Sequence, residues 1–285
     1  MSSVVTKVDD LISFVVAASD QEVEEDEEYT LYYWPLKNRG NFIRLLFAVS
    51  NVPYQEISSI KEVGQFFRGS KDDDADSKDD QKGQKSEYRP IFPPALKIEN
   101  LKDSKKGSSF MFCQTVPIVL YLAEKFGLMP SDKYDAIRAH EWSENLNDLI
   151  VEIYHTNFSE FRGAKCRRKE MSKQEMSEWI DVRLYKFLNP LEQHLDEKAD
   201  YFFDARLTYF DLVCFNVVDA LNELFASKFD EIVRKKCPKL AKHYVFTGRH
   251  EYVERLMEQQ RQKNIVWFWL PDGSWQRTKK MMDWV

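Results

Sequence analysis

Apolar residues recur with two different periods in the first half of the chain. Two short runs typical of strands, "YTLYYW" (29–34) and "PYQEIS" (53–58), flank "GNFIRLLFAVSN" (40–51), whose apolar positions have a helical period. Two more strands joined by a polar hairpin are expected at "PPALKIEN" and "SSFMFCQ", and a helix at "TVPIVLYLAEKFG" (115–127). This order predicts a small α/β layer of four strands.

The helix expected at 115–127 has signals at both of its ends. Thr115 has a side chain suited to the N-cap, and Pro117 falls in the first turn, where no backbone N–H is required. Gly127 marks the C-terminal end, where a left-handed residue is common.

The second half of the chain is helical in pattern. Apolar positions recur with a helical period in four long segments with polar breaks between them, at 132–161, 172–198, 208–226 and 238–262. Thr208 and Asp211 are spaced three apart at the start of the third segment, which is the spacing of a capping box. These features predict an all-α bundle.

Polar and acidic stretches divide the chain further. The run "DQEVEEDEE" (20–28) predicts a solvated linker, and "GSKDDDADSKDDQKGQKSE" predicts a disordered insertion over about residues 69–88. Four of the seven tryptophans lie in the C-terminal tail. We therefore expect an acidic N-terminal extension, an α/β domain that carries the insertion, an all-α domain and a tryptophan-rich extension, at 1–28, 29–128, 132–262 and 263–285.

Composition narrows the classes of function. A net charge of −6 and a pI near 5.6 argue against nucleic acid or an anionic membrane as the main partner. The four cysteines have no disulfide-like or metal-like spacing, so we expect a reducing compartment, the cytoplasm, and no bound metal. No membrane-spanning run is found, and "LISFVVAAS" follows two aspartates, which favours a short amphipathic helix over a signal peptide.

Four motifs in this order resemble the cytosolic glutathione transferases, most closely the tyrosine-using Sigma, Pi, Mu and Alpha classes. They are "YYWPLKNRGNFIRLLFA", "PPALKI", "FCQTVPIVLYLAEKFGL" and "LTYFDL". The resemblance covers about residues 29–262. It implies a thioredoxin-like N-terminal domain with a four-stranded mixed sheet, an all-α helical-bundle C-terminal domain, glutathione as co-substrate, an electrophilic small molecule as second substrate, and a homodimer.

The resemblance also implies a catalytic pair. Tyr33 occupies the position of the family's catalytic tyrosine, and Arg39 that of a basic residue that helps to stabilise the thiolate. Lowering a thiol pKa of about 8.5 by two units requires about 2.7 kcal/mol. A hydrogen bond to a charged acceptor supplies about 1.5–3 kcal/mol, so one phenol with modest help suffices. Because neighbouring strand residues point to opposite faces, Tyr32 is expected to serve packing.

Further positions are carried over as contacts to glutathione. The Pro93–Pro94 bond resembles the family's cis-proline turn, which pairs with the cysteinyl segment. Gln114 and Thr115 lie where an expected strand ends and a helix begins. The free N–H groups and positive dipole at such a helix N-terminus suit the γ-glutamyl carboxylate. Asp148 aligns with an acidic residue that reaches across the dimer interface, and Phe158 with an aromatic residue of the electrophile pocket.

The chain departs from the family in three places. The loop after the second strand lacks the tryptophan that normally grips the glycine carboxylate, and Arg68, Lys71 and Arg89 are open as substitutes. His250 replaces a proline near the end of the helical domain. The tryptophan-rich tail is expected either to cover the electrophile pocket or to seal the helical domain or an oligomer interface.

Three functions follow from these observations. The first is a glutathione transferase that conjugates glutathione to electrophiles. The second is a non-catalytic member of the fold, serving as a ligand-binding, scaffold or structural protein. A cysteine-dependent thiol transferase is disfavoured because no cysteine precedes Cys113.

Overall fold

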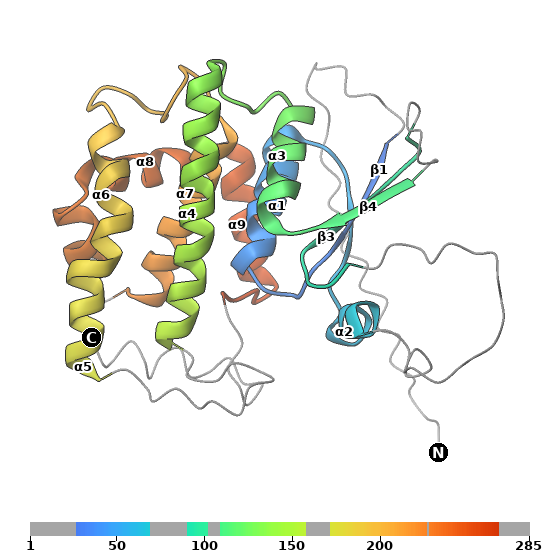
Figure 1. Cartoon of the computed structure of the whole chain (residues 1–285), viewed down its shortest axis with the longest axis horizontal. Helices are drawn as coiled ribbons and strands as arrows, with labels where there is room; N and C mark the ends of the chain where they lie inside the picture. Colours follow the sequence, from blue (N-terminus) through green and yellow to red (C-terminus); the bar gives the residue numbers. More distant parts are fainter. Residues whose placement is uncertain (1–26, 69–89, 102–108, 158–171, 227, 268–285) are drawn as a thin grey trace. The chain divides into compact units, whose positions relative to one another are not determined.

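The computed structural model describes residues 27–68, 90–101, 109–157, 172–226 and 228–267 (Figure 1). The described residues form two compact units. Unit 1 contains those up to Pro35 and from Asn51 to Gln114, and unit 2 those from Leu36 to Ser50 and from Thr115 onward. The predicted domain boundaries remain a prediction. The predicted insertion, Phe158, the tail beyond Trp267 and the predicted acidic linker as far as residue 26 lie outside the described residues. Glu28, assigned to that linker from the sequence, is the first residue of a strand.

Unit 1 is built on a four-stranded mixed sheet. Its strands are β1 (Glu28–Tyr32), β2 (Gln55–Ile57), β3 (Ala95–Glu99) and β4 (Ser109–Cys113), in the order β2-β1-β3-β4. Strand β1 pairs in parallel with β2 and antiparallel with β3, and β3 pairs antiparallel with β4. The sheet confirms the predicted α/β class.

Unit 1 also contains a helix that the sequence analysis treats as a loop. Helix α2 (Ile60–Arg68) follows β2 directly. Val63 is fully buried, and the ring of Phe66 stacks on Tyr32 with 4.3 Å between the ring centroids. The spacing of Val63, Phe66 and Phe67 is a helical signal, but it extends over too few residues to stand out from the polar stretch that follows.

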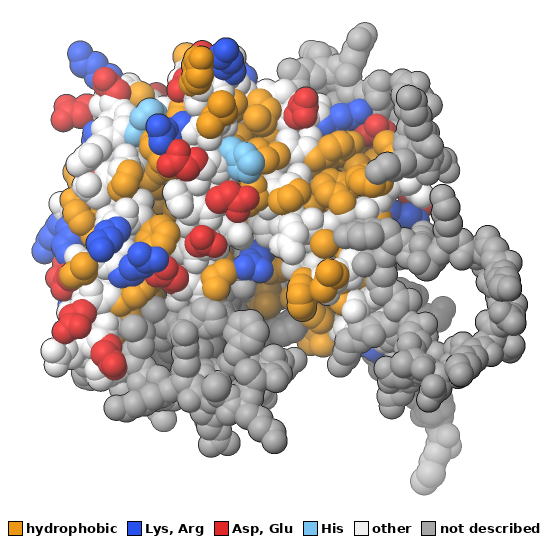
Figure 2. Space-filling view, viewed as in Figure 1, with side chains coloured by type: hydrophobic (Ala, Val, Ile, Leu, Met, Phe, Trp, Pro, Cys, Tyr) orange, Lys and Arg blue, Asp and Glu red, His pale blue; other side chains and the backbone are white. Residues whose placement is uncertain are grey.

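The secondary structure of unit 2, in its described residues, consists of helices joined by loops, apart from one isolated bridge between Leu36 and Val266 (Figure 1). Figure 2 shows Lys, Arg, Asp and Glu side chains interspersed over the visible face of this unit. The helical segments, including two π-helical ones, are α1 (Asn38–Ser50), α3 (Thr115–Lys125), α4 (Lys133–Asn157), α5 (Lys173–Glu178), η2 (Trp179–Leu184), α6 (Tyr185–His194), α7 (Tyr209–Leu224), η3 (Asp230–Lys235), α8 (Pro238–Gly248) and α9 (Glu251–Gln262).

Helix α7 forms the core of unit 2. It is apolar on nearly all sides and packs against α1, α4 and α8. Its N-terminus is held by Asp211, which accepts the backbone N–H of Thr208 at 2.8 Å and that of Phe202 at 2.9 Å. The predicted capping pair is therefore confirmed.

Two of the predicted helical segments are divided in the structure. The segment at 172–198 consists of α5, η2 and α6 in succession, and the segment at 238–262 breaks between α8 and α9 at Arg249 and His250. Helix α3 ends as predicted, with Gly127 at a φ of 67° and the Leu128 N–H donating to the Ala123 carbonyl. None of the helices described here is long and apolar enough to cross a membrane.

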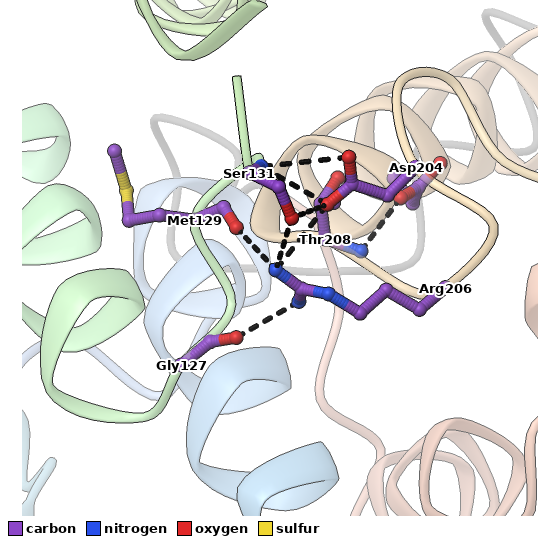
Figure 3. A network of polar contacts seen from close by, with 7 residues as sticks. Gly127, Met129, Ser131, Asp204, Arg206 and Thr208 are labelled. Atoms are coloured by element: carbon purple, nitrogen blue, oxygen red, sulfur yellow. Dashed lines mark hydrogen bonds and ion pairs between the residues drawn. The ribbon is translucent and has the colours of Figure 1, made fainter. Parts of the chain in front are cut away.

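Arg206 anchors the chain segment that follows α3 through hydrogen bonds (Figure 3). The guanidinium of Arg206 donates to the carbonyl oxygens of Gly127 at 2.8 Å and Met129 at 2.7 Å. Asp204 accepts the backbone N–H of Ser131 at 3.1 Å and its hydroxyl group at 2.9 Å. The loop before α7 thereby satisfies backbone groups of the 127–131 segment.

Candidate functional site

Three of the predicted site residues emerge at one end of the sheet in unit 1. The strand register places Tyr32 opposite Ala95, and Ala95 opposite Cys113. Tyr33 directly follows β1, Pro94 directly precedes β3, and Gln114 directly follows β4. Neighbouring strands of a sheet are about 4.8 Å apart, so the three residues lie side by side at this end. The Gln114 N–H donates to the Pro94 carbonyl oxygen at 3.1 Å, which links two of the three directly.

The two tyrosines of this end differ in environment. Tyr33 is 3% exposed, and its backbone N–H extends the pairing with β2 by donating to the Ile57 carbonyl at 3.1 Å. Tyr32 is half-buried and stacks on Phe66 of α2. The packing of Tyr32 matches its predicted role, whereas the catalytic role of Tyr33 remains a prediction.

Gln114 has an unusual backbone. Its φ is 86°, a region that non-glycine residues rarely adopt and that is concentrated at functional sites. Its side chain is exposed. Helix α3 begins at the next residue, Thr115, so Gln114 precedes the first helical residue in place of the predicted cap. The preceding Pro93–Pro94 bond is cis, as the resemblance implies.

The other predicted residues belong to unit 2 or lie outside the described residues. Arg39 is the second residue of α1 and is half-buried. Thr115 is buried at the start of α3, and Asp148 is exposed on α4. In the part of the chain that the structure describes, no group of three or more His, Cys, Asp or Glu residues could hold a metal ion.

Unit 2 contains a buried polar cluster that the sequence analysis missed. Lys37, 4% exposed, forms ion pairs with Asp219 at 3.2 Å and Glu223 at 2.5 Å. The Tyr244 hydroxyl donates to Asp219 at 3.1 Å. The ring of Trp267, which is fully buried, lies 5.8 Å from the Lys37 ammonium. We call Lys37, Asp219, Glu223 and Trp267 the lysine cluster.

A second polar chain runs beside the lysine cluster. The side-chain amide of Gln260 in α9 donates to Oδ1 of Asn41 at 2.5 Å, and the side-chain amide of Asn41 in α1 donates to Oδ1 of Asn216 in α7 at 2.7 Å. A polar stripe at 216, 219 and 223 on the otherwise apolar α7 is the signal that could have indicated both sets of contacts.

Burial shapes the electrostatics of the cluster. It raises the pKa of the Glu223 carboxyl group above its usual value, an effect that the neighbouring Lys37 only partly opposes. The pKa of Tyr244 is also raised, first by burial and then by the negative charge of Asp219. Tyr244 is therefore a neutral hydrogen-bond donor to that carboxylate.

The helical unit and the whole fold have known counterparts. Residues 157–260 match the family model described as "Glutathione S-transferase, C-terminal domain". The sigma class glutathione transferase of Fasciola hepatica has a similar structure, with a TM-score of 0.60 at 15% sequence identity, covering 82% of this chain and 96% of that one. In fold, and over residues 157–260 also in sequence, this chain is similar to the cytosolic glutathione transferases. Its four-stranded sheet and its helical part have the thioredoxin-like and all-α folds seen in these proteins.

Two curated proteins that are similar to this chain are crystallins. "S-crystallin 4" of Enteroctopus dofleini is 20% identical over 217 residues, which span 74% of this chain and 87% of that protein. "S-crystallin SL18" of Nototodarus sloanii is 24% identical over 156 residues, or 55% of this chain. The match spans only 41% of the length of that second relative.

Proposed function

We propose that the protein is a glutathione transferase in which the Tyr33 hydroxyl group stabilises the thiolate of bound glutathione. The observation that carries this proposal is the convergence of Tyr33, Pro94 and Gln114 at one end of the sheet. Glutathione binds there with its cysteinyl segment beside the Pro93–Pro94 turn and its γ-glutamyl carboxylate near Gln114 and Thr115. Arg39 adds positive charge, and Asp148 and Phe158 keep their predicted roles.

The chemistry follows from the ionisation of the thiol. The phenol donates a hydrogen bond that the thiolate accepts more strongly than the thiol, so the thiol loses its proton to water at a lower pH. The sulfur then attacks an electrophilic carbon. With an aromatic halide, one carbon–sulfur bond forms, one carbon–halogen bond breaks, and halide leaves with the electron pair.

The burial of Tyr33 sets a condition on this mechanism. Glutathione has to reach a residue that is 3% exposed, so in this proposal neighbouring side chains move when glutathione binds. This observation also favours a second candidate function, a non-catalytic structural or ligand-binding role. The crystallin names of the two curated relatives support that candidate as well.

A binding experiment separates the two candidates. The full-length protein is applied to glutathione–agarose, and its conjugation of glutathione to an aromatic halide is followed by absorbance. The transferase proposal predicts retention, elution by free glutathione, and turnover. Failure of both measurements with correctly folded protein would refute it in favour of the non-catalytic role.

We further propose a homodimer in the cytoplasm. Ile91 and Phe92 of unit 1 are 70% and 65% exposed, and large apolar side chains with such exposure favour a protein partner. The spacing of the four cysteines, which has no disulfide-like pattern, favours a reducing compartment. Light scattering after size exclusion should give twice the chain mass for the wild type and a lower mass for Phe92→Ser. A wild-type mass of 33.8 kDa would contradict the dimer.

A further inference from the structure

The turn that precedes α1 is held through its backbone by a distant part of the chain. Leu36 forms a parallel bridge with Val266, and the Lys37 N–H donates to the Val266 carbonyl oxygen at 2.8 Å. The Leu36 carbonyl oxygen accepts from the Arg44 guanidinium. Each contact fixes the path of the chain immediately before the helix that contains Arg39.

The same turn is held through a side chain. Lys37 places its ammonium between two carboxylates of α7, Asp219 and Glu223, under the ring of Trp267. Transfer of an ammonium group out of water costs several kcal/mol, and a buried ion pair is often no more stabilising than apolar side chains of equal volume. Stability alone therefore gives a weak reason to bury this lysine, whereas fixing the position of the turn gives a better one.

Only one residue separates Lys37 from Arg39, so the position of Lys37 constrains that of Arg39. Asn38, which separates them, has a φ of 32° and is the first residue of α1. Arg39 is the next residue, so a shift of the turn moves the start of the helix and the attached guanidinium together. We propose that Lys37 is a positioning residue, which acts through the lysine cluster to hold Arg39 where it stabilises the thiolate.

This inference rests on the proposed function, because it concerns the thiolate of bound glutathione. Lys37 itself does not contact glutathione in the proposal. Its removal should therefore affect the ionisation of the thiol more than the affinity for the tripeptide. An interaction made only with the charged form changes the thiol pKa, whereas general loosening of the fold lowers stability and affinity.

The test compares Lys37→Met with Lys242→Met, which removes an exposed lysine of α8, in the full-length protein. Three quantities are measured: the pKa of the bound glutathione thiol by ultraviolet absorption of the thiolate, the pH profile of conjugation, and backbone amide exchange of the 34–44 segment without glutathione. For Lys37→Met we expect the thiol pKa to rise by about half a unit to one unit. We expect kcat/KM near neutral pH to fall about threefold to tenfold and to recover at higher pH, with faster exchange at 36–39.

A second variant guards against loss of folding. Trp267→Leu removes the ring beside Lys37 and the indole N–H beside Glu223 but keeps all three charged side chains, so it should shift the thiol pKa in the same direction but less. Either variant overturns the proposal if it folds, binds glutathione, and leaves the thiol pKa and the exchange at 36–39 unchanged. If the wild type fails to bind glutathione, the proposed function and the role toward Arg39 both fail, and the exchange data still decide whether Lys37 anchors the turn.

Discussion

The sheet end of unit 1 and the lysine cluster of unit 2 are assembled in different ways. At the sheet end, Tyr33, Pro94 and Gln114 are brought together by strand pairing and lie within motifs that can be read from the sequence. In the lysine cluster, Lys37 and Asp219 are 182 residues apart, and no local pattern connects them. The residues of the sheet end can each be identified within a short sequence motif. The residues of the lysine cluster can be identified only from the folded chain.

The difference predicts different consequences of substitution. A side chain at the sheet end should affect chemistry with little effect on stability, because its neighbours are held by backbone hydrogen bonds. Within the lysine cluster, loss of a buried charged partner, Lys37 or Asp219, should lower stability strongly, because the opposite charge is left buried with less compensation. Substitutions in the two regions test this contrast.

Loss of a buried carboxylate should have the largest effect. Asp219→Asn removes the more buried of the two carboxylate charges that face Lys37 and should lower the free energy of unfolding by about 3–5 kcal/mol, because a buried ammonium is left undercompensated. Urea unfolding measures this change. The control Asp230→Asn removes an exposed carboxylate that pairs with Arg234 and should change stability by less than about 1 kcal/mol. Equal losses in the two variants would remove the contrast.

Exchange of the phenol for a phenyl group tests the sheet end. Tyr33→Phe should lower kcat/KM for conjugation about 10- to 100-fold, the value of one hydrogen bond to a charged acceptor. Tyr32→Phe is the matched control, and it should keep nearly full activity because its ring still stacks on Phe66. Steady-state kinetics on both variants give the answer. Full activity of Tyr33→Phe together with loss in Tyr32→Phe would reverse the assignment of the two tyrosines.

Arg206 should have an effect on stability between that of a buried charge and that of a surface pair, since it joins distant segments but is half-exposed (Figure 3). Arg206→Gln removes hydrogen bonds to the carbonyl oxygens of Gly127 and Met129 and should cost about 1 kcal/mol of unfolding free energy. Arg261→Gln, which removes a surface pair with Glu258, should be close to neutral. Thermal unfolding of both variants distinguishes anchoring of the 127–131 segment from a generic loss of charge.

The smallest effect is a pH dependence. Because the pKa of Glu223 is raised, mainly by burial, its proton is bound more tightly in the folded protein than in the unfolded chain. The stability that it contributes is present below pH 4.5 and is lost as the pH rises through the raised pKa. Glu223→Gln avoids this loss, so its stability relative to the wild type should increase from pH 4.5 upward.

A second carboxylate supplies a control of opposite sign. Hydrogen bonds from Arg261 lower the pKa of Glu258, so its contribution is present above its usual pKa and is lost as the pH falls. Glu258→Gln should therefore lose stability relative to the wild type as the pH rises. Parallel pH profiles for the two variants would show that the environment of Glu223 has no special influence.

Much of the fold could be predicted because its signals are local. Strand runs, the helical period of 115–125 and the glycine stop at Gly127 each depend on neighbouring residues, and the structure confirms them. Helix α2 was missed because its apolar stripe is short and runs into a polar stretch. The break between α8 and α9 was missed because Arg249 and His250 are not strong helix-breaking residues.

In the candidate site, too, the features with local signals could be predicted, and those that depend on packing could not. The alignment of three predicted residues at the sheet end followed from motif order, while the burial of Tyr33 depends on packing that no periodicity reports. Lys37 looks like any solvated lysine in the stretch "PLKNRG". Its burial depends on α7 and on Val266 and Trp267, which only the folded chain brings near.

The bridge between Leu36 and Val266 has a consequence for synthesis of the protein. On the ribosome, Leu36 and Lys37 emerge early, and Val266 and Trp267 emerge only after α9 has been made. Until then the turn before α1 lacks its backbone acceptor and the cover over its charge. The start of this helix is therefore completed by nearly the last described residues to leave the ribosome.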